Sequence, residues 1–147
     1  MEFTIIINAP KEKVWDALWD NANYEQWAAA FMEGSRAVTD NWKEGTKVLF
    51  LGTTDSGMVS MVAANKPNGF MSFKHLGIVK DGIEDTESDE AKKWSGGIES
   101  YTLRDIDGGT ELHISLVADN MPQEFVDYFI GVWPKALDKV KEIAEKN

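Results

Sequence analysis

Residues 122–146 of the chain read PQEFVDYFIGVWPKALDKVKEIAEK. Apolar side chains recur in this stretch at spacings of three and four, the period at which residues share one face of an α-helix. Twenty-odd helical residues span about 35 Å, which is enough to cross a small domain. Such a helix needs a concave apolar partner for its broad aromatic stripe. The stripe consists of Phe125, Val126, Phe129, Ile130, Trp133, Leu137, Val140 and Ile143.

The start and the middle of this helix carry their own signals. Asp119 or Asn120 can cap its first turn. Pro134 removes the hydrogen bond to the carbonyl of Ile130, at a cost of about 3 kcal/mol. We therefore expect a kink or break near residues 130–134. Such a kink is either a gate, in which the first half of the helix moves, or a static bend that follows a curved partner.

Between Gly34 and Val117 the pattern changes to short strands separated by turn signals. Alternation is clearest in the last strand, where Leu112 and Ile114 share one face and His113 lies on the other. A β-branched run at residues 4–7 adds a strand at the start of the chain. About seven strands result, at residues 4–7, 35–39, 47–51, 58–64, 70–76, 98–106 and 110–117.

Two short helices are expected between the first strand and the second. Pro10 suits the first turn of a helix, and apolar residues follow it at helical spacing until about residues 20–23. A second helix then carries Tyr24, Trp27 and Phe31. These elements predict an α+β fold: a curved antiparallel sheet of about seven strands, wrapped around the long C-terminal helix.

Local motifs add a resemblance to a known family. They are Ile7-Asn8-Ala9-Pro10 with Val14-Trp15, Tyr24 with Trp27, Gly57 with Val59, Phe70-x-Ser72-Phe73-x-His75, Tyr101-Thr102-Leu103 with Asp107-Gly108-Gly109, and Gly131-x-Trp133. In this order they resemble the START-like superfamily, in its SRPBCC group. The nearest branch looks similar to the C-terminal domain of the heat-shock-protein-90 ATPase activator. The resemblance implies one helix-grip domain over residues 1–147, with a cavity between sheet and helix. It also implies a family of ligand carriers, cyclases, aromatases and co-chaperone domains.

Composition excludes several functions. The net charge of −10 repels phosphate backbones and anionic headgroups, so neither nucleic acid nor a membrane is an expected partner. The chain has no cysteine, and no signal peptide or apolar span is visible, so we expect a cytoplasmic protein. No metal or cofactor is expected, because Asp85-x-Glu87-x-Asp89 fails as a calcium loop: Glu90 stands where that loop needs glycine. The acidic stretch Asp81–Glu90 is expected to be a solvated loop.

The leading hypothesis is that the cavity binds a small apolar or aromatic ligand. Aromatic side chains and methionine line apolar pockets well, and an inward Tyr101 hydroxyl needs a polar partner. His113 is expected to point outward. A register shift of one residue would replace Phe73 and His75 by Ser72 and Lys74 on the inner face. The proposed ligand contacts are Phe73, His75, Tyr101, Phe129, Trp133, Trp27, Phe50 and Phe125.

Two other functions stay open. A cyclase or isomerase would use the same cavity, with His75 or Tyr101 as acid or base. A co-chaperone-like interaction module would bind a protein partner through Asp81–Glu90.

Overall fold

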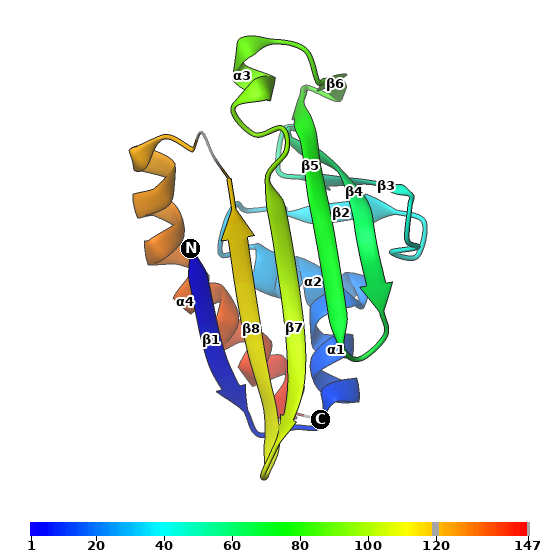
Figure 1. The fold of residues 1–147 in the computed structure, drawn as a ribbon, viewed down its shortest axis with the longest axis vertical. Helices are drawn as coiled ribbons and strands as arrows, with labels where there is room; N and C mark the ends of the chain where they lie inside the picture. Colours follow the sequence, from blue (N-terminus) through cyan, green and yellow to red (C-terminus); the bar gives the residue numbers. More distant parts are fainter. Residues whose placement is uncertain (119–120, 147) are drawn as a thin grey trace.

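The computed structural model describes residues 1–118 and 121–146, and its strands form one antiparallel sheet (Figure 1). The strands are β1 (Glu2–Ile7), β2 (Arg36–Thr39), β3 (Lys47–Leu51), β4 (Gly57–Lys66), β5 (Phe70–Lys80), β6 (Ile83–Asp85), β7 (Ile98–Ile106) and β8 (Gly109–Val117). Their order is β1-β8-β7-β5-β4-β3-β2, and β6 pairs with β5 beside this path. The first and last strands along this path are therefore the two near the start of the chain.

The helices are α1 (Lys11–Trp19), α2 (Asn21–Ala28), α3 (Asp89–Lys92) and α4 (Gln123–Lys146). Figure 1 shows α1 and α2 behind the sheet and α3 apart from them, at the top beside β6. The long helix α4 contacts α1, α2 and β1. The expected α+β helix-grip fold of the START-like kind is thus confirmed, with a sheet of eight strands rather than about seven.

The pairing of β4 with β5 shifts register twice, and each strand contributes one extra residue. Leu76 of β5 lies between the pairs Val59–Gly77 and Ser60–His75, and Ala63 of β4 lies between the pairs Val62–Phe73 and Ala64–Ser72. Such bulges bend a strand and interrupt its alternation of faces. Val59 joins a small separate cluster with Leu51 and Val79, whereas the main core lies on the helix side of the sheet.

The core on the helix side is strongly aromatic. Trp19 is at its centre, with ring centroids of Tyr101 and Trp42 4.8 and 4.9 Å away. The Trp42 indole N–H donates to the Trp19 carbonyl oxygen at 2.8 Å, and that of Trp27 donates to Leu18 O at 3.0 Å. These bonds fix the indoles in place and close the core on the side of α1.

Helix α4 continues through Pro134 without a break. Figure 1 shows its first turns, in orange, at an angle to its last turns, in red, as a bend would give. Every buried residue of α4 lies at or after Trp133, and none lies in its first ten residues, Gln123–Val132. The expected caps Asp119 and Asn120 lie outside the described residues. Pro134 therefore separates a buried half of the helix from a half with little burial.

Three local expectations need correction. Helix α2 ends at Ala28, so Phe31 lies beyond it. Strand β5 runs on to Lys80, and the acidic stretch is not a plain loop, because it contains β6 and the first residues of α3. The turn Asp81-Gly82 has positive φ at both residues, as a two-residue hairpin requires. Strand β6 lies so close to β5 that a Cβ on Gly77 would be 2.2 Å from a carbonyl oxygen.

Candidate functional site

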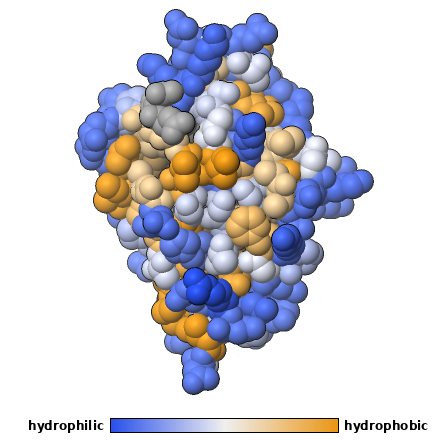
Figure 2. Space-filling model, in the orientation of Figure 1, coloured by the Kyte–Doolittle hydropathy of each residue, from blue (hydrophilic) through white to orange (hydrophobic). Residues whose placement is uncertain are grey.

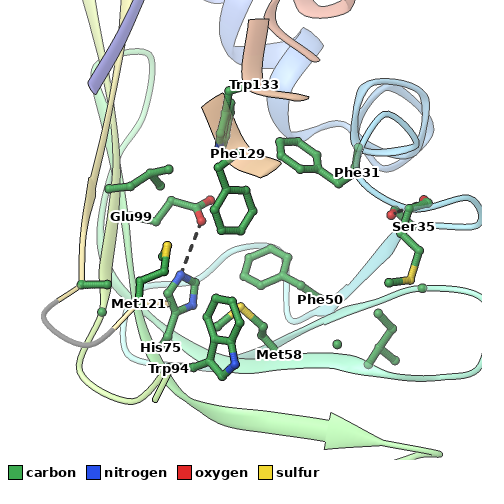
Figure 3. Close-up of a pocket in the computed structure, with 18 of the residues that line it drawn as sticks. Phe31, Ser35, Phe50, Met58, His75, Trp94, Glu99, Met121, Phe129 and Trp133 are labelled. Atoms are coloured by element: carbon green, nitrogen blue, oxygen red, sulfur yellow. Dashed lines mark hydrogen bonds and ion pairs between the residues drawn. The ribbon is translucent and has the colours of Figure 1, made fainter. Parts of the chain in front are cut away.

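A cavity of about 200 Å³ opens between the concave face of the sheet, α2 and the poorly buried half of α4 (Figure 3). For comparison, a cavity of about 150 Å³ in a protein core can hold benzene. Most of its wall is apolar. The aromatic and methionine side chains that line it are Tyr24, Trp27, Phe31, Met32, Phe50, Met58, Trp94, Tyr101, Met121, Phe129 and Trp133.

Aromatic contacts hold the wall of the cavity in place. The rings of Phe31 and Trp133 meet edge to face with centroids 4.8 Å apart, and Trp133 also stacks on Phe3 at 6.0 Å. The Tyr128 hydroxyl donates to the carbonyl oxygen of Phe31, which connects the first turns of α4 to the segment after α2. Both elements therefore position one side of the cavity together.

One chain of polar contacts, two hydrogen bonds joined by an ion-pair contact, crosses the otherwise apolar wall. The Ser60 hydroxyl lies 2.7 Å from His75 Nδ1, and His75 Nε2 lies 3.4 Å from Glu99 Oε1. The Tyr101 hydroxyl donates to the other oxygen of Glu99. Figure 3 shows the His75–Glu99 contact facing the aromatic rings of the cavity. Strands β4, β5 and β7 bring these four residues together.

The donors of this chain can all point toward Glu99. When Ser60 donates to Nδ1, the Nε2 proton of His75 faces Glu99, and the carboxylate accepts a hydrogen bond from Tyr101. Burial raises the pKa of Tyr101 well above its usual value, and the nearby Glu99 charge raises it further. At neutral pH the Tyr101 phenol therefore keeps its proton, so it donates a hydrogen bond and cannot act as a base. Ser60 is wholly buried and does not line the cavity, so it orients His75 and cannot act as a nucleophile on a ligand there.

Six of the eight proposed contact residues line the cavity. They are Trp27, Phe50, His75, Tyr101, Phe129 and Trp133. Phe73 does not, because its fully buried ring packs among Trp19, Trp42 and Phe50 in the core. Phe125 does not either, because its ring packs on Trp94, 4.8 Å away between centroids. The contact of any of these residues with a ligand stays a prediction.

The cavity residue that sequence reasoning missed is Glu99. Alternation in residues 98–106 places Glu99 on the same face as Tyr101 and Leu103, which are both buried. This alternation could have predicted that Glu99 points inward and is a polar partner of Tyr101. Trp94, one of the aromatic residues considered for the cavity wall but outside the eight proposed contacts, also lines the cavity; it follows the short helix α3, which the sequence did not predict.

The remaining candidate residues lie elsewhere. His113 faces the outside of the sheet, where it contacts Thr4 and Glu2, as expected. No residue of Asp81–Glu90 lines the cavity. Within that stretch, hydrogen bonds from Ser88 lower the pKa of Asp85, which caps the turn before α3. Across residues 1–118 and 121–146, no group of acids or histidines has the geometry of a metal site, and no helix is long and apolar enough to span a membrane.

Neither a protein-family model nor a curated protein sequence matches this chain. Solved structures do. Protein MLL2253 from Mesorhizobium loti has a TM-score of 0.74 and 16% identity, over 100% of this chain and 98% of its own. The Aha1 dimer from Colwellia psychrerythraea has a TM-score of 0.74 and 16% identity, over 99% and 95%. CalU16 from Micromonospora echinospora has a TM-score of 0.67 and 17% identity, over 97% and 74%.

At these identities the likeness concerns the fold and not the activity. In this chain the fold is an antiparallel sheet with a long C-terminal helix against it. The chain therefore has the START-like, helix-grip fold.

Proposed function

We propose that the protein binds a small apolar or aromatic molecule in the cavity between the sheet and α4. The observation that carries this proposal is an aromatic cavity of about 200 Å³ next to a core whose other rings are in close contact. Transfer of an apolar ligand into such a cavity is favourable by about 25 cal/mol for each Å² of apolar surface removed from water. The placement of the chain in the branch of the heat-shock-protein-90 activator, and its location in the cytoplasm, belong to the same proposal.

The first test is a thermal-shift screen against lipids, sterols, flavonoids and aromatic polyketides. A ligand at about 100 times its dissociation constant stabilises the folded state by about 2.7 kcal/mol, which for this chain length corresponds to roughly 5–10 °C. We expect shifts of this size within one chemical class.

A cavity-filling variant tests where that ligand binds. Leu116 lines the cavity and pairs with Glu99 across β7 and β8, so Leu116→Trp places a large side chain inside it. We expect this variant to lose the ligand-induced shift. Ile6→Trp is the matched control, because Ile6 is 45% exposed on β1 and does not line the cavity. Circular dichroism and the melting temperature without ligand check that both variants fold. Equal shifts in both would contradict the proposed site.

A cyclase or isomerase is the second candidate, and the chain of polar contacts from Ser60 to Tyr101 is the observation that favours it. Glu99 or His75 would accept a proton from a substrate in the cavity, and Tyr101 would donate a hydrogen bond to it. Any compound found in the screen is incubated with the protein and analysed by mass spectrometry for conversion. We expect His75→Gln to abolish conversion while binding persists; unchanged conversion would remove His75 from the mechanism. If no compound in the library binds, the remaining candidate function is a protein-interaction module that binds its partner through Asp81–Glu90.

A further inference from the structure

Glu99 is an acid in an aromatic wall. Among the described residues that line the cavity there is no lysine and no arginine, and Glu99 is the one carboxylate. Its side chain is 19% exposed. A carboxylate in so apolar a place is stabilised chiefly by the groups that face it, because water reaches it poorly.

The groups that face the Glu99 carboxylate are the Tyr101 phenol and the His75 imidazole. Tyr101 donates a hydrogen bond to one carboxylate oxygen, and His75 Nε2 lies 3.4 Å from the other. Two carboxylate oxygens offer about four acceptor positions, so about half of them are left for a third partner. That partner has to be a donor and gains most if it is positively charged.

The rings around the carboxylate favour the same charge. Figure 3 shows Phe129, Trp133, Phe31 and Phe50 around the space that the Glu99 carboxylate faces. Aromatic faces attract cations, and they do so more strongly when the cation is shielded from water. An anionic or strongly hydrogen-bond-accepting ligand would meet both the ring faces and Glu99 with repulsion. The net charge of −10 also raises the local concentration of cations.

We propose that the cavity selects an organic cation, an aromatic or alkyl amine or a quaternary ammonium compound, whose charged group binds at Glu99. The inference rests on the proposed function, because it requires that the cavity takes up a small molecule at all. The aromatic wall holds the apolar part of the ligand, and Glu99 with the ring faces holds its charge.

The test compares two compounds of the same shape. Benzyltrimethylammonium carries a charge, and neopentylbenzene is its neutral carbon analogue. Each displaces the neutral dye N-phenyl-1-naphthylamine from the protein at about pH 8, above the range in which imidazole side chains usually titrate. We expect the cation to bind at least about ten-fold more tightly than its analogue.

Two variants assign that preference to Glu99. Glu99→Gln keeps the size of the side chain and an acceptor for Tyr101, and His75 can take the other tautomer to meet the amide. We expect this variant to lose most of the preference and to bind the neutral analogue unchanged. Glu25→Gln removes one charge from the exposed face of α2 and keeps the preference.

The outcomes separate the two proposals. Equal affinity for both compounds, or a preference that survives in Glu99→Gln, overturns the inference and leaves ligand binding standing. If neither compound nor the dye binds, the proposed function falls and the inference falls with it.

Discussion

Tyr24 and Tyr101 make the stability of the protein sensitive to alkali. Their exposed fractions are 7% and 1%, and burial, assisted by the charge of Glu99, raises the pKa of both phenols. In the unfolded chain a tyrosine ionises near pH 10. The unfolded state then releases a proton that the folded state retains. Stability is therefore fully present below about pH 10 and falls above it, by roughly 1.4 kcal/mol per pH unit for each tyrosine.

Urea unfolding at about pH 9 and at about pH 11 measures this loss. The control is Tyr24→Phe, which removes one of the two phenols and keeps the ring in the core. We expect the variant to lose less stability between the two pH values than the parent protein. An equal loss would show that Tyr24 contributes nothing to the alkaline transition.

At the scale of single residues, the sequence predicted which face of a strand a side chain occupies. It did not predict which residues that side chain contacts. His75 and Phe73 both point to the helix side, as the alternation of β5 indicated, yet only His75 reaches the cavity. The difference is a matter of packing, because Phe73 is surrounded by Trp19 and Trp42 from other elements. Contacts of this kind join residues distant in sequence, and no local pattern contains them. The inward position of Glu99, by contrast, could have been predicted from the alternation of its own strand.

Among the elements, α4 has two halves of unequal stability. Local opening is easiest where few side chains are buried, and all of the buried side chains of α4 lie at or after Trp133. We expect amide hydrogens of residues 127–132 to exchange at least about ten-fold faster than those of residues 137–144. Hydrogen exchange followed by mass spectrometry resolves the two halves.

The same experiment distinguishes a gate from a static bend at Pro134. A gate predicts that a bound ligand slows exchange in the first half, because Phe129 lines the cavity, and that Pro134→Ala slows it as well. Equal protection of the two halves, with or without ligand, would leave the proline as a bend only.

The elements that the sequence missed share one cause. Strand β6 has three residues and α3 has four, too few for a periodic pattern to develop. The Asp81-Gly82 pair was the available signal, since this dipeptide favours a two-residue hairpin. The bulges at Ala63 of β4 and Leu76 of β5 were not predicted, because one extra residue in a strand is too short a feature for a periodic pattern to mark.

For the molecule as a whole, the long periodic segments were enough to predict the architecture. A helix with a broad apolar stripe and several alternating strands can bury their faces only against one another. The volume of the cavity could not be predicted in this way, because it depends on how closely rings from different elements approach one another. Figure 2 presents the same face of the molecule as Figure 1, and on this face apolar groups form patches among polar ones.

The net charge of −10 predicts a salt effect on stability. Like charges on the folded surface repel one another more strongly than in the expanded chain, and added salt screens them. We expect the melting temperature to rise by a few degrees between about 20 mM and about 300 mM sodium chloride. Calorimetry at constant pH measures it. A lower melting temperature in salt would mean that the ion pairs of the surface contribute more than the excess of carboxylates costs.

The six tryptophans can be divided into those that line the cavity and those that do not. Trp27, Trp94 and Trp133 face the cavity, whereas Trp15, Trp19 and Trp42 do not. Trp19 nevertheless lies within 6.4 Å of Trp27, centroid to centroid, and within 4.9 Å of Trp42. At such separations excitation energy passes readily from indole to indole. Light absorbed in the core can therefore be emitted at the cavity wall, and we expect the protein's own emission to change when a ligand occupies the cavity.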